Sequence, residues 1–272
     1  MLKKTFLLFS FSLIIVFLYT AGAMAQETEA AEGDAGGIGL TVGLDYWSNY
    51  YWRGTPYFQE DGVFFPTVAY DVMGSGLVLT LGAELSEDWV FDGKPVDTSA
   101  SPDGVDNKDI HSTDFAVDYS TTIADMVSVG GGFWYFLTWN TDYNFMYWYL
   151  TAGLTSVPLS PTLTFYHDIY QESGDAKDFY VQLALSHGFE LTKEAGLTLG
   201  VAGGYYNYDS YGLRGISDID FSAALEIAVG IVTYTSSFHY IIVPTKDFYD
   251  YTAPGAKDIN RFYASFGASV SL

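Results

Sequence analysis

Cysteine is absent from the 272 residues of the chain. Without cysteine no disulfide framework can form, and no lipid-modified cysteine can follow a signal peptide, so a lipoprotein is excluded. Basic residues are scarce as well, with 11 Lys and Arg against 33 Asp and Glu and a net charge of −22. A chain this acidic does not bind nucleic acid by neutralising phosphates, so we expect no nucleic-acid partner.

Long hydrophobic runs are also missing, with one exception at the start. The uncharged run 6–19 follows Lys3 and Lys4 and precedes the small residues Ala23 and Ala25. This order predicts a cleavable signal peptide over residues 1–25. An uncleaved membrane anchor is less favoured, because a spanning helix needs about 20 apolar residues. Cleavage would remove two lysines and leave a net charge of −24.

After the signal peptide no second run of spanning length follows, so we expect no transmembrane helix in the mature chain. Residues 26–37 are acidic and small, and they predict a flexible lead-in. From residue 38 onward the hydrophobic pattern has a period of two, as at Leu77, Leu79 and Leu81. About twelve such strands are predicted, over residues 38–53, 62–72, 77–90, 113–123, 126–138, 145–155, 162–171, 179–190, 197–208, 218–228, 231–242 and 260–272.

The predicted connections alternate in length. The connections that we expect to be short are 73–76, 124–125, 157–161, 192–196 and 229–230. Those expected to be longer are 54–61, 91–112, 139–144, 172–178, 209–217 and 243–259. Short turns on one rim and longer loops on the other are typical of outer-membrane barrels, and both chain ends then lie at the periplasmic rim.

A soluble two-sheet protein would also alternate, but its polar face would carry Lys and Glu. Here the mid-strand polar positions are mostly Gly, Ser, Thr, Tyr and Asp, and none is Lys. Tyr and Trp also crowd the strand ends, as the aromatic girdles of a membrane barrel would require. We therefore predict an all-β, transmembrane, antiparallel up-and-down barrel over residues 38–272, located in the outer membrane of a Gram-negative-type cell. Outer-membrane lipid and the barrel assembly machinery are the expected partners.

Alternate residues of a strand face opposite sides of the barrel wall, and we call the side that a residue faces its parity. Because carboxylates facing lipid would be costly, this parity directs a set of charged side chains into the predicted lumen. The predicted lumen or constriction residues are Arg53, Arg261, Asp45, Glu84, Asp118, Asp168, Asp220 and Glu226. Arg53 and Arg261 fall on the first and last strands, so closure should place them side by side. These charges form either an internal salt-bridge network or a selective constriction, in which the acids favour cations and the arginines contact anions or sugar hydroxyls.

Inward parity also applies to a group of tyrosines, whose rings could contact sugars or nucleobases. The possible aromatic lumen contacts are Tyr51, Tyr147, Tyr149, Tyr166, Tyr206 and Tyr263. Ordinary packing of the lumen explains the same residues and is the favoured interpretation.

Signs of catalysis and cofactors are weak. None of the four histidines lies two residues before a serine, the local pattern of barrel phospholipases, and His167 and Asp168 face opposite sides of a strand. No metal, phosphate-loop or dinucleotide spacing occurs, so we expect no cofactor and no bound metal. We therefore predict that the protein is not an enzyme. A hydrolase is the third hypothesis, and the acidic segments 91–112 and 243–259 are assigned no role.

The segment Ser48-Asn49-Tyr50-Tyr51-Trp52-Arg53-Gly54 resembles the S-N-Y-x-x-R-G element of an uncharacterised family of bacterial exported outer-membrane proteins. Segments 165–170, 179–180 and 185–191 resemble the second half of that family. The resemblance implies an outer-membrane barrel and no settled activity. Leu272 departs from the terminal Phe that is usual in such barrels, although the last strand otherwise alternates as expected.

The preferred functional hypothesis is a porin-like channel for passive diffusion of small polar solutes. The alternative is a structural or adhesion barrel whose lumen is plugged.

Overall fold

The computed structural model describes residues 38–58, 62–87, 90, 111–139, 144–170, 177–248 and 260–272. The predicted signal peptide and lead-in lie outside the described residues, as do most of the long loops 91–112 and 243–259. Within the described ranges, no helix is long and apolar enough to cross a membrane.

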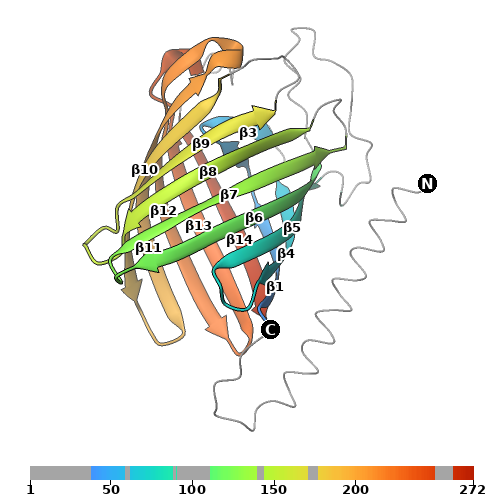
Figure 1. Ribbon diagram of the computed structural model, residues 1–272, viewed down its shortest axis with the longest axis vertical. Coiled ribbons are helices and arrows are strands. Elements are labelled where there is room, and N and C mark those ends of the chain that lie inside the picture. Colours follow the sequence, from blue (N-terminus) through green and yellow to red (C-terminus); the bar gives the residue numbers. More distant parts are fainter. Residues whose placement is uncertain are drawn as a thin grey trace, which may run out of the picture.

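Twelve strands close into one barrel (Figure 1). Their bounds are β1 Leu40–Trp47, β4 Val63–Asp71, β5 Leu77–Ser86, β6 Ser112–Ile123, β7 Val127–Thr138, β8 Phe145–Leu154, β9 Thr162–Tyr170, β10 Phe179–Glu190, β11 Ala195–Tyr208, β12 Leu213–Val229, β13 Val232–Ile242 and β14 Asn260–Ser271. A 3-10 turn, η1 (Asp209–Tyr211), connects β11 to β12. Each strand pairs antiparallel with the wall strands before and after it in sequence, and β1 pairs with β14 to close the ring.

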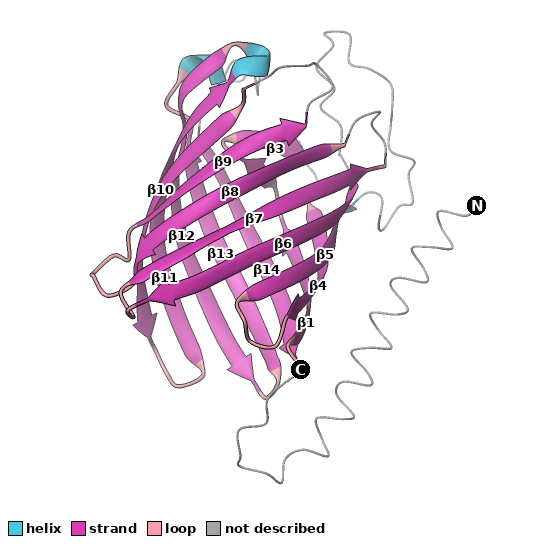
Figure 2. Ribbon diagram, in the orientation of Figure 1, coloured by secondary structure: helices cyan, strands magenta, loops and turns pink. Residues whose placement is uncertain are grey.

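The predicted strand set and topology are confirmed. The tight turns gather at one rim, and the carboxyl terminus lies at the same rim (Figure 2). Closure at this rim is completed by the backbone of Gly39, whose N–H donates to the carbonyl of Leu272 over 3.0 Å. The turn from β6 to β7 has positive φ at both Ala124 (52°) and Asp125 (55°). Two positive φ values in succession give the twist that a tight antiparallel hairpin needs.

The apolar side of the alternating pattern faces outward. Leu79, Leu81 and Phe221 are 43%, 48% and 47% exposed. Two stacked sheets would bury these side chains, so the soluble sandwich is excluded. Apolar side chains continue outward around the barrel, at Phe115, Val117, Leu150, Leu163, Leu183, Phe238, Phe262 and Phe266. Such a belt is suited to hydrocarbon rather than water.

The prediction for the first strand is wrong beyond residue 47. At that point the backbone N–H of Ser48 still donates to the carbonyl of Ala264 over 2.9 Å, and the side-chain hydroxyl of Ser48 accepts the backbone N–H of Ala264 over 3.0 Å. When a serine side chain accepts a hydrogen bond from the neighbouring strand, the backbone beyond it can leave the sheet. The chain then forms a separate two-stranded hairpin, β2 (Tyr50–Trp52) and β3 (Thr55–Phe58), in place of the end of a wall strand and the loop 54–61.

Candidate functional site: a hairpin across the barrel interior

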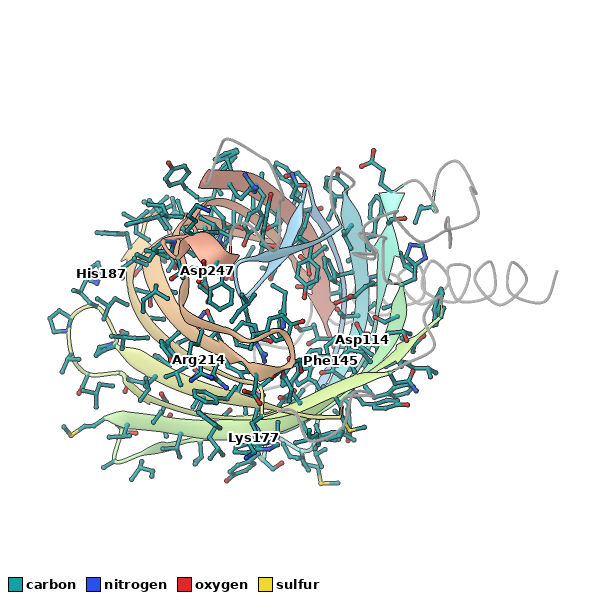
Figure 3. The ribbon with its side chains drawn as sticks, turned by 90° about the horizontal axis from the view of Figure 1, so that it is seen from above. Asp114, Phe145, Lys177, His187, Arg214 and Asp247 are labelled. Atoms are coloured by element: carbon teal, nitrogen blue, oxygen red, sulfur yellow. The ribbon has the colours of Figure 1, made fainter. Side chains whose placement is uncertain are left out.

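The β2–β3 hairpin crosses the interior and reaches the opposite wall. Its tip is formed by Arg53 and Gly54, which have φ values of 53° and 82°. The guanidinium of Arg53 contacts Asp168 on β9, and five strands separate β9 from β1 in either direction around the ring. Figure 3 looks down into this ring of strands. The hairpin therefore spans the full width of the barrel.

One guanidinium nitrogen of Arg53 contacts both oxygens of a carboxylate. Its Nη1 donates to both carboxylate oxygens of Asp168 over 3.1 Å, and the two side chains are 3% and 1% exposed. The same nitrogen donates to the hydroxyl of Tyr206 over 3.4 Å. Five aromatic rings surround the guanidinium at 4.9 to 5.5 Å from their centroids, those of Trp52, Tyr147, Tyr166, Tyr180 and Tyr206. A buried pair of this kind costs about 3–5 kcal/mol when one partner is removed.

Other parts of the hairpin are fixed to the wall at separate points. The hydroxyl of Tyr50 is hydrogen-bonded to Glu84 on β5. The ring of Tyr51 packs on Tyr263 of β14 with centroids 5.7 Å apart. At the tip, a Cβ on Gly54 would lie 2.7 Å from the carbonyl oxygen of Ser217 on β12, so only glycine allows this close approach. With Asp168 on β9 and Tyr206 on β11, these contacts hold the hairpin to five wall strands in addition to β1.

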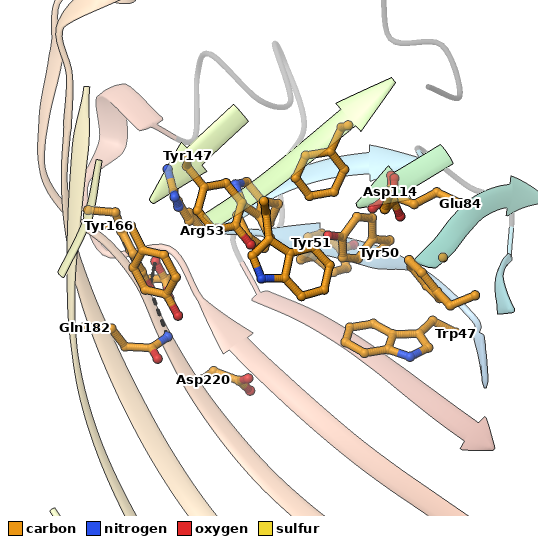
Figure 4. A pocket seen from close by; sticks show the side chains of 18 of the residues that line it. Trp47, Tyr50, Tyr51, Arg53, Glu84, Asp114, Tyr147, Tyr166, Gln182 and Asp220 are labelled. Atoms are coloured by element: carbon orange, nitrogen blue, oxygen red, sulfur yellow. Dashed lines mark hydrogen bonds between the residues drawn. The ribbon is translucent and has the colours of Figure 1, made fainter. Parts of the chain in front are cut away.

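Beside the hairpin lies a cavity of about 430 Å³ (Figure 4). Eleven aromatic side chains line it, among them Trp47, Phe65 and Trp134. The acidic lining residues are Glu84, Asp114, Asp218 and Asp220. Among the described residues that line the cavity, Arg53 is the sole basic side chain, and its charge is already paired. The cavity is therefore aromatic and acidic.

Three polar atoms at this cavity are buried without a hydrogen-bond partner among the described residues. They are Nε1 of Trp52, Nη2 of Arg53 and Oδ1 of Asp220, two donors and one acceptor. Buried polar groups without partners cost free energy, so a ligand or water that offers both hydroxyl hydrogens and oxygens would be stabilised here.

Most of the acids assigned to the lumen have their carboxylates among side chains of the barrel interior. Asp118 accepts hydrogen bonds from Trp134 Nε1 over 3.2 Å and from the hydroxyl of Tyr149 over 2.7 Å. Glycines make room for these groups, because a methyl on Gly132 would overlap the Asp118 carboxylate. Asp45 faces Gly267 on β14 in the same way. Glu84, Asp168 and Asp220 line the interior, as described above.

The prediction that Arg53 and Arg261 lie side by side is wrong. Arg53 is not a wall residue beside Arg261, because the chain leaves the sheet after Trp47 and carries Arg53 to Asp168. Arg261 stays on β14, where it interacts electrostatically with Tyr51. Glu226 keeps the inward parity of β12, because Phe221 and Ile227 face outward, and it is exposed close to the turn that ends the strand.

All six predicted tyrosines lie inside the barrel, although Tyr51 belongs to the hairpin rather than to the wall. Tyr147, Tyr206 and Tyr263 are buried, and Tyr149 and Tyr166 are partly buried with ring centroids 5.6 Å apart. Packing accounts for these contacts, and Tyr51, Tyr147, Tyr166 and Tyr263 also face the cavity.

Several lumen residues were missed at the sequence level. Tyr180 donates to Asp218 over 2.9 Å, and Asp114 lies near Glu84. Asp114 shares the parity of Asp118, so the alternation of β6 could have found it. Asp218 stood at the predicted start of its strand, whereas β12 begins at Leu213. His239 contacts Asp220 from a neighbouring strand, and that contact leaves no mark in the local sequence.

No protein-family model and no curated protein sequence matches the chain. Several solved structures resemble it, two porins among them. The NanC porin has a TM-score of 0.52 at 11% identity, covering 86% of this chain and 100% of that chain. The KdgM porin, in complex with disordered oligogalacturonate, has a TM-score of 0.51 at 10% identity, covering 85% and 99%. At these identities the likeness establishes a shared fold alone, a closed antiparallel β-barrel.

Proposed function

We propose that the protein is an outer-membrane channel for passive diffusion of small polar solutes, narrowed by the β2–β3 hairpin. The observation that carries the proposal is the aromatic, acidic cavity beside the hairpin inside a closed barrel. The apolar outer belt supports a place in the outer membrane, with membrane lipid around it. Export through the signal peptide 1–25 and insertion by the barrel assembly machinery belong to the same proposal.

The solutes are inferred to be neutral or cationic. Four carboxyl side chains line the cavity, and its one described basic residue is bound to Asp168. Rings of carboxylates attract cations and repel anions in narrow pores. The aromatic faces and the unpartnered donors and acceptor favour solutes with several hydroxyl groups.

Membership of the exported family with the S-N-Y-x-x-R-G element is proposed as well. In this chain Ser48 ends β1, Arg53 binds Asp168 and Gly54 packs on Ser217. These roles offer a physical reason for three positions of that element.

The test is conductance of the purified protein in planar lipid bilayers. We expect discrete current steps and, across a KCl gradient, a reversal potential with the sign of cation selectivity. A sealed structural barrel is the second candidate, and the buried hairpin favours it. A variant with residues 50–58 replaced by a Gly/Ser linker separates the two candidates. If neither the wild type nor this variant conducts, the channel proposal is wrong and the sealed barrel is supported. Cell-surface labelling of folded protein confirms insertion in both cases.

A further inference from the structure

A serine and a histidine lie two residues apart on the inner face of β13. The Oγ of Ser237 is 2.9 Å from the Nε2 of His239. Residues two apart on a strand share a face, and the outward neighbours Phe238 and Tyr240 are exposed. In the barrel-phospholipase pattern the histidine comes first, whereas in this chain Ser237 precedes His239.

The neighbouring strand supplies an acid to the other side of the same ring. Oδ2 of Asp220 on β12 lies 2.9 Å from Nδ1 of His239. A carboxylate at Nδ1 fixes the proton on that nitrogen and leaves Nε2 free to accept the proton of Ser237. This is the order of groups that activates a serine hydroxyl as a nucleophile.

The imidazole is held in place and can still be reached from the lumen. It stacks on Tyr263 with centroids 4.4 Å apart and planes 7° apart. Trp47 lies 6.3 Å from the same ring at an interplanar angle of 18°. The His239 side chain is 18% exposed, and Asp220, Tyr263 and Trp47 all line the lumen cavity. A small solute in the cavity would therefore lie close to the Ser–His–Asp chain.

We propose that Ser237, His239 and Asp220 hydrolyse small acyl esters that enter the lumen, an activity separate from diffusion through the channel. Ser237 Oγ attacks the ester carbonyl while His239 Nε2 takes the hydroxyl proton. The proton passes to the leaving alcohol as the carbon–oxygen bond breaks, and an acyl-serine remains. Water then attacks this acyl group, His239 takes and returns one proton, and a carboxylic acid and free Ser237 are released.

The surroundings of Ser237 restrict the substrate class. Backbone N–H groups of β13 and β14 are engaged in the strand ladder, so they offer no pair of amides to a developing oxyanion. The hydroxyl of Ser265, 2.7 Å from Ser237 Oγ, is a side-chain donor beside the nucleophile. Loss of a single oxyanion donor costs about 10²–10³ in rate in hydrolases that have two. Activated esters of small alcohols are therefore expected as substrates, and peptides are not.

The absence of cysteine allows a test that needs no substrate. Ser237→Cys creates a unique thiol next to His239, and an adjacent imidazole lowers the pKa of a thiol and so raises its thiolate fraction. We expect iodoacetamide to alkylate this thiol about tenfold faster at neutral pH than in Ser237→Cys/His239→Ala. The pH midpoint of alkylation should be lower in Ser237→Cys than in Ser237→Cys/His239→Ala. Adding Asp220→Asn to Ser237→Cys should raise the midpoint again. Equal rates and equal midpoints in the three proteins would overturn the proposal and leave a structural hydrogen-bonded chain.

A second measurement reads the activity directly. Purified, folded protein is treated with a fluorophosphonate probe and assayed with p-nitrophenyl acetate. We expect labelling at Ser237, located by peptide mass spectrometry, and loss of hydrolysis in Ser237→Ala. His187→Ala is the matched control, because His187 is exposed and lies on β10, away from this serine. Heat-modifiable gel migration verifies that each variant is folded. Unlabelled Ser237 with unchanged hydrolysis in Ser237→Ala contradicts the proposal, whatever the conductance of the channel.

Discussion

Arg53 and Asp168 form an ion pair that joins the tip of an internal hairpin to the wall opposite the strand from which the hairpin arises. Nη1 lies 3.1 Å from each carboxylate oxygen, and both side chains are almost fully buried. The pair is the charged contact at the far end of the hairpin, where it anchors the tip to the opposite wall. The first prediction follows from this geometry.

Arg53→Ala should release the hairpin tip and leave Asp168 buried without its partner. We expect a larger single-channel conductance and a barrel destabilised by about 3–5 kcal/mol, the usual cost of breaking a buried pair. The measurements are current steps in planar bilayers and urea unfolding in lipid vesicles.

The double variant Arg53→Ala/Asp168→Asn is the control for charge burial. It should recover much of the stability, because no uncompensated carboxylate remains, while the conductance stays high. If both variants conduct like the wild type, the pair does not hold the hairpin across the pore.

Glu84 and Asp114 interact with each other at the cavity wall. Glu84→Gln combined with Asp114→Asn should reduce the preference for K⁺ over Cl⁻, because two acidic groups are removed from the permeation path. The measurement is the reversal potential across a KCl gradient. Glu190→Gln combined with Glu194→Gln is the matched control, since it removes the same number of charges and both side chains are exposed, at the end of β10 and in the turn before β11. An equal shift in both variants would mean that overall protein charge, and not the cavity, sets selectivity.

Gly204 and Gly203 are adjacent on β11 but face different surroundings. A methyl group on Gly204 would overlap the ring of Tyr180, whereas one on Gly203 would meet no atom within 4 Å. Gly204→Ala should therefore displace Tyr180 from Asp218 and destabilise the barrel by about 1–3 kcal/mol. Gly203→Ala should change stability by less than about 0.5 kcal/mol. Comparable urea midpoints for the two variants would be evidence against the packing of Tyr180 against this glycine.

His111 lies just before β6 and is 1% exposed, and burial lowers its pKa to about 4. Its Nε2 accepts the backbone N–H of Ser86 over 3.4 Å, so the ring is neutral in the folded barrel. The unfolded chain takes up this proton near pH 6.5, and the folded barrel does so near pH 4. Stability should therefore fall as the pH drops from 6.5 to 4, by up to about 3 kcal/mol, and then level off.

The measurement is the difference in urea unfolding between the wild type and His111→Gln from pH 7.5 to 4. Glutamine can accept the same hydrogen bond but does not titrate, so the variant should lose this part of the pH dependence. Parallel curves for the two proteins would show that protonation of His111 does not contribute.

The sequence alone determined the barrel because alternation is a local signal. Leu79 and Leu81 face outward for the same reason that Asp118 faces inward, since each strand residue lies on the side opposite its neighbour. Bounds predicted from this alternation lie close to the observed ones for most strands. The same alternation directs Glu84, Asp168 and Asp220 toward the interior.

The tertiary structure decided what the inward residues do. Residues 48–53 continue the alternating pattern, so nothing local showed that Ser48 would end the strand and that Arg53 would cross the lumen to Asp168. Asp220 and His239 meet because β12 and β13 pair in one register, and sequence distance carries no record of that register. The direction of a side chain follows from the backbone of its own strand. The residues that it contacts depend on how all twelve strands pair to close the barrel.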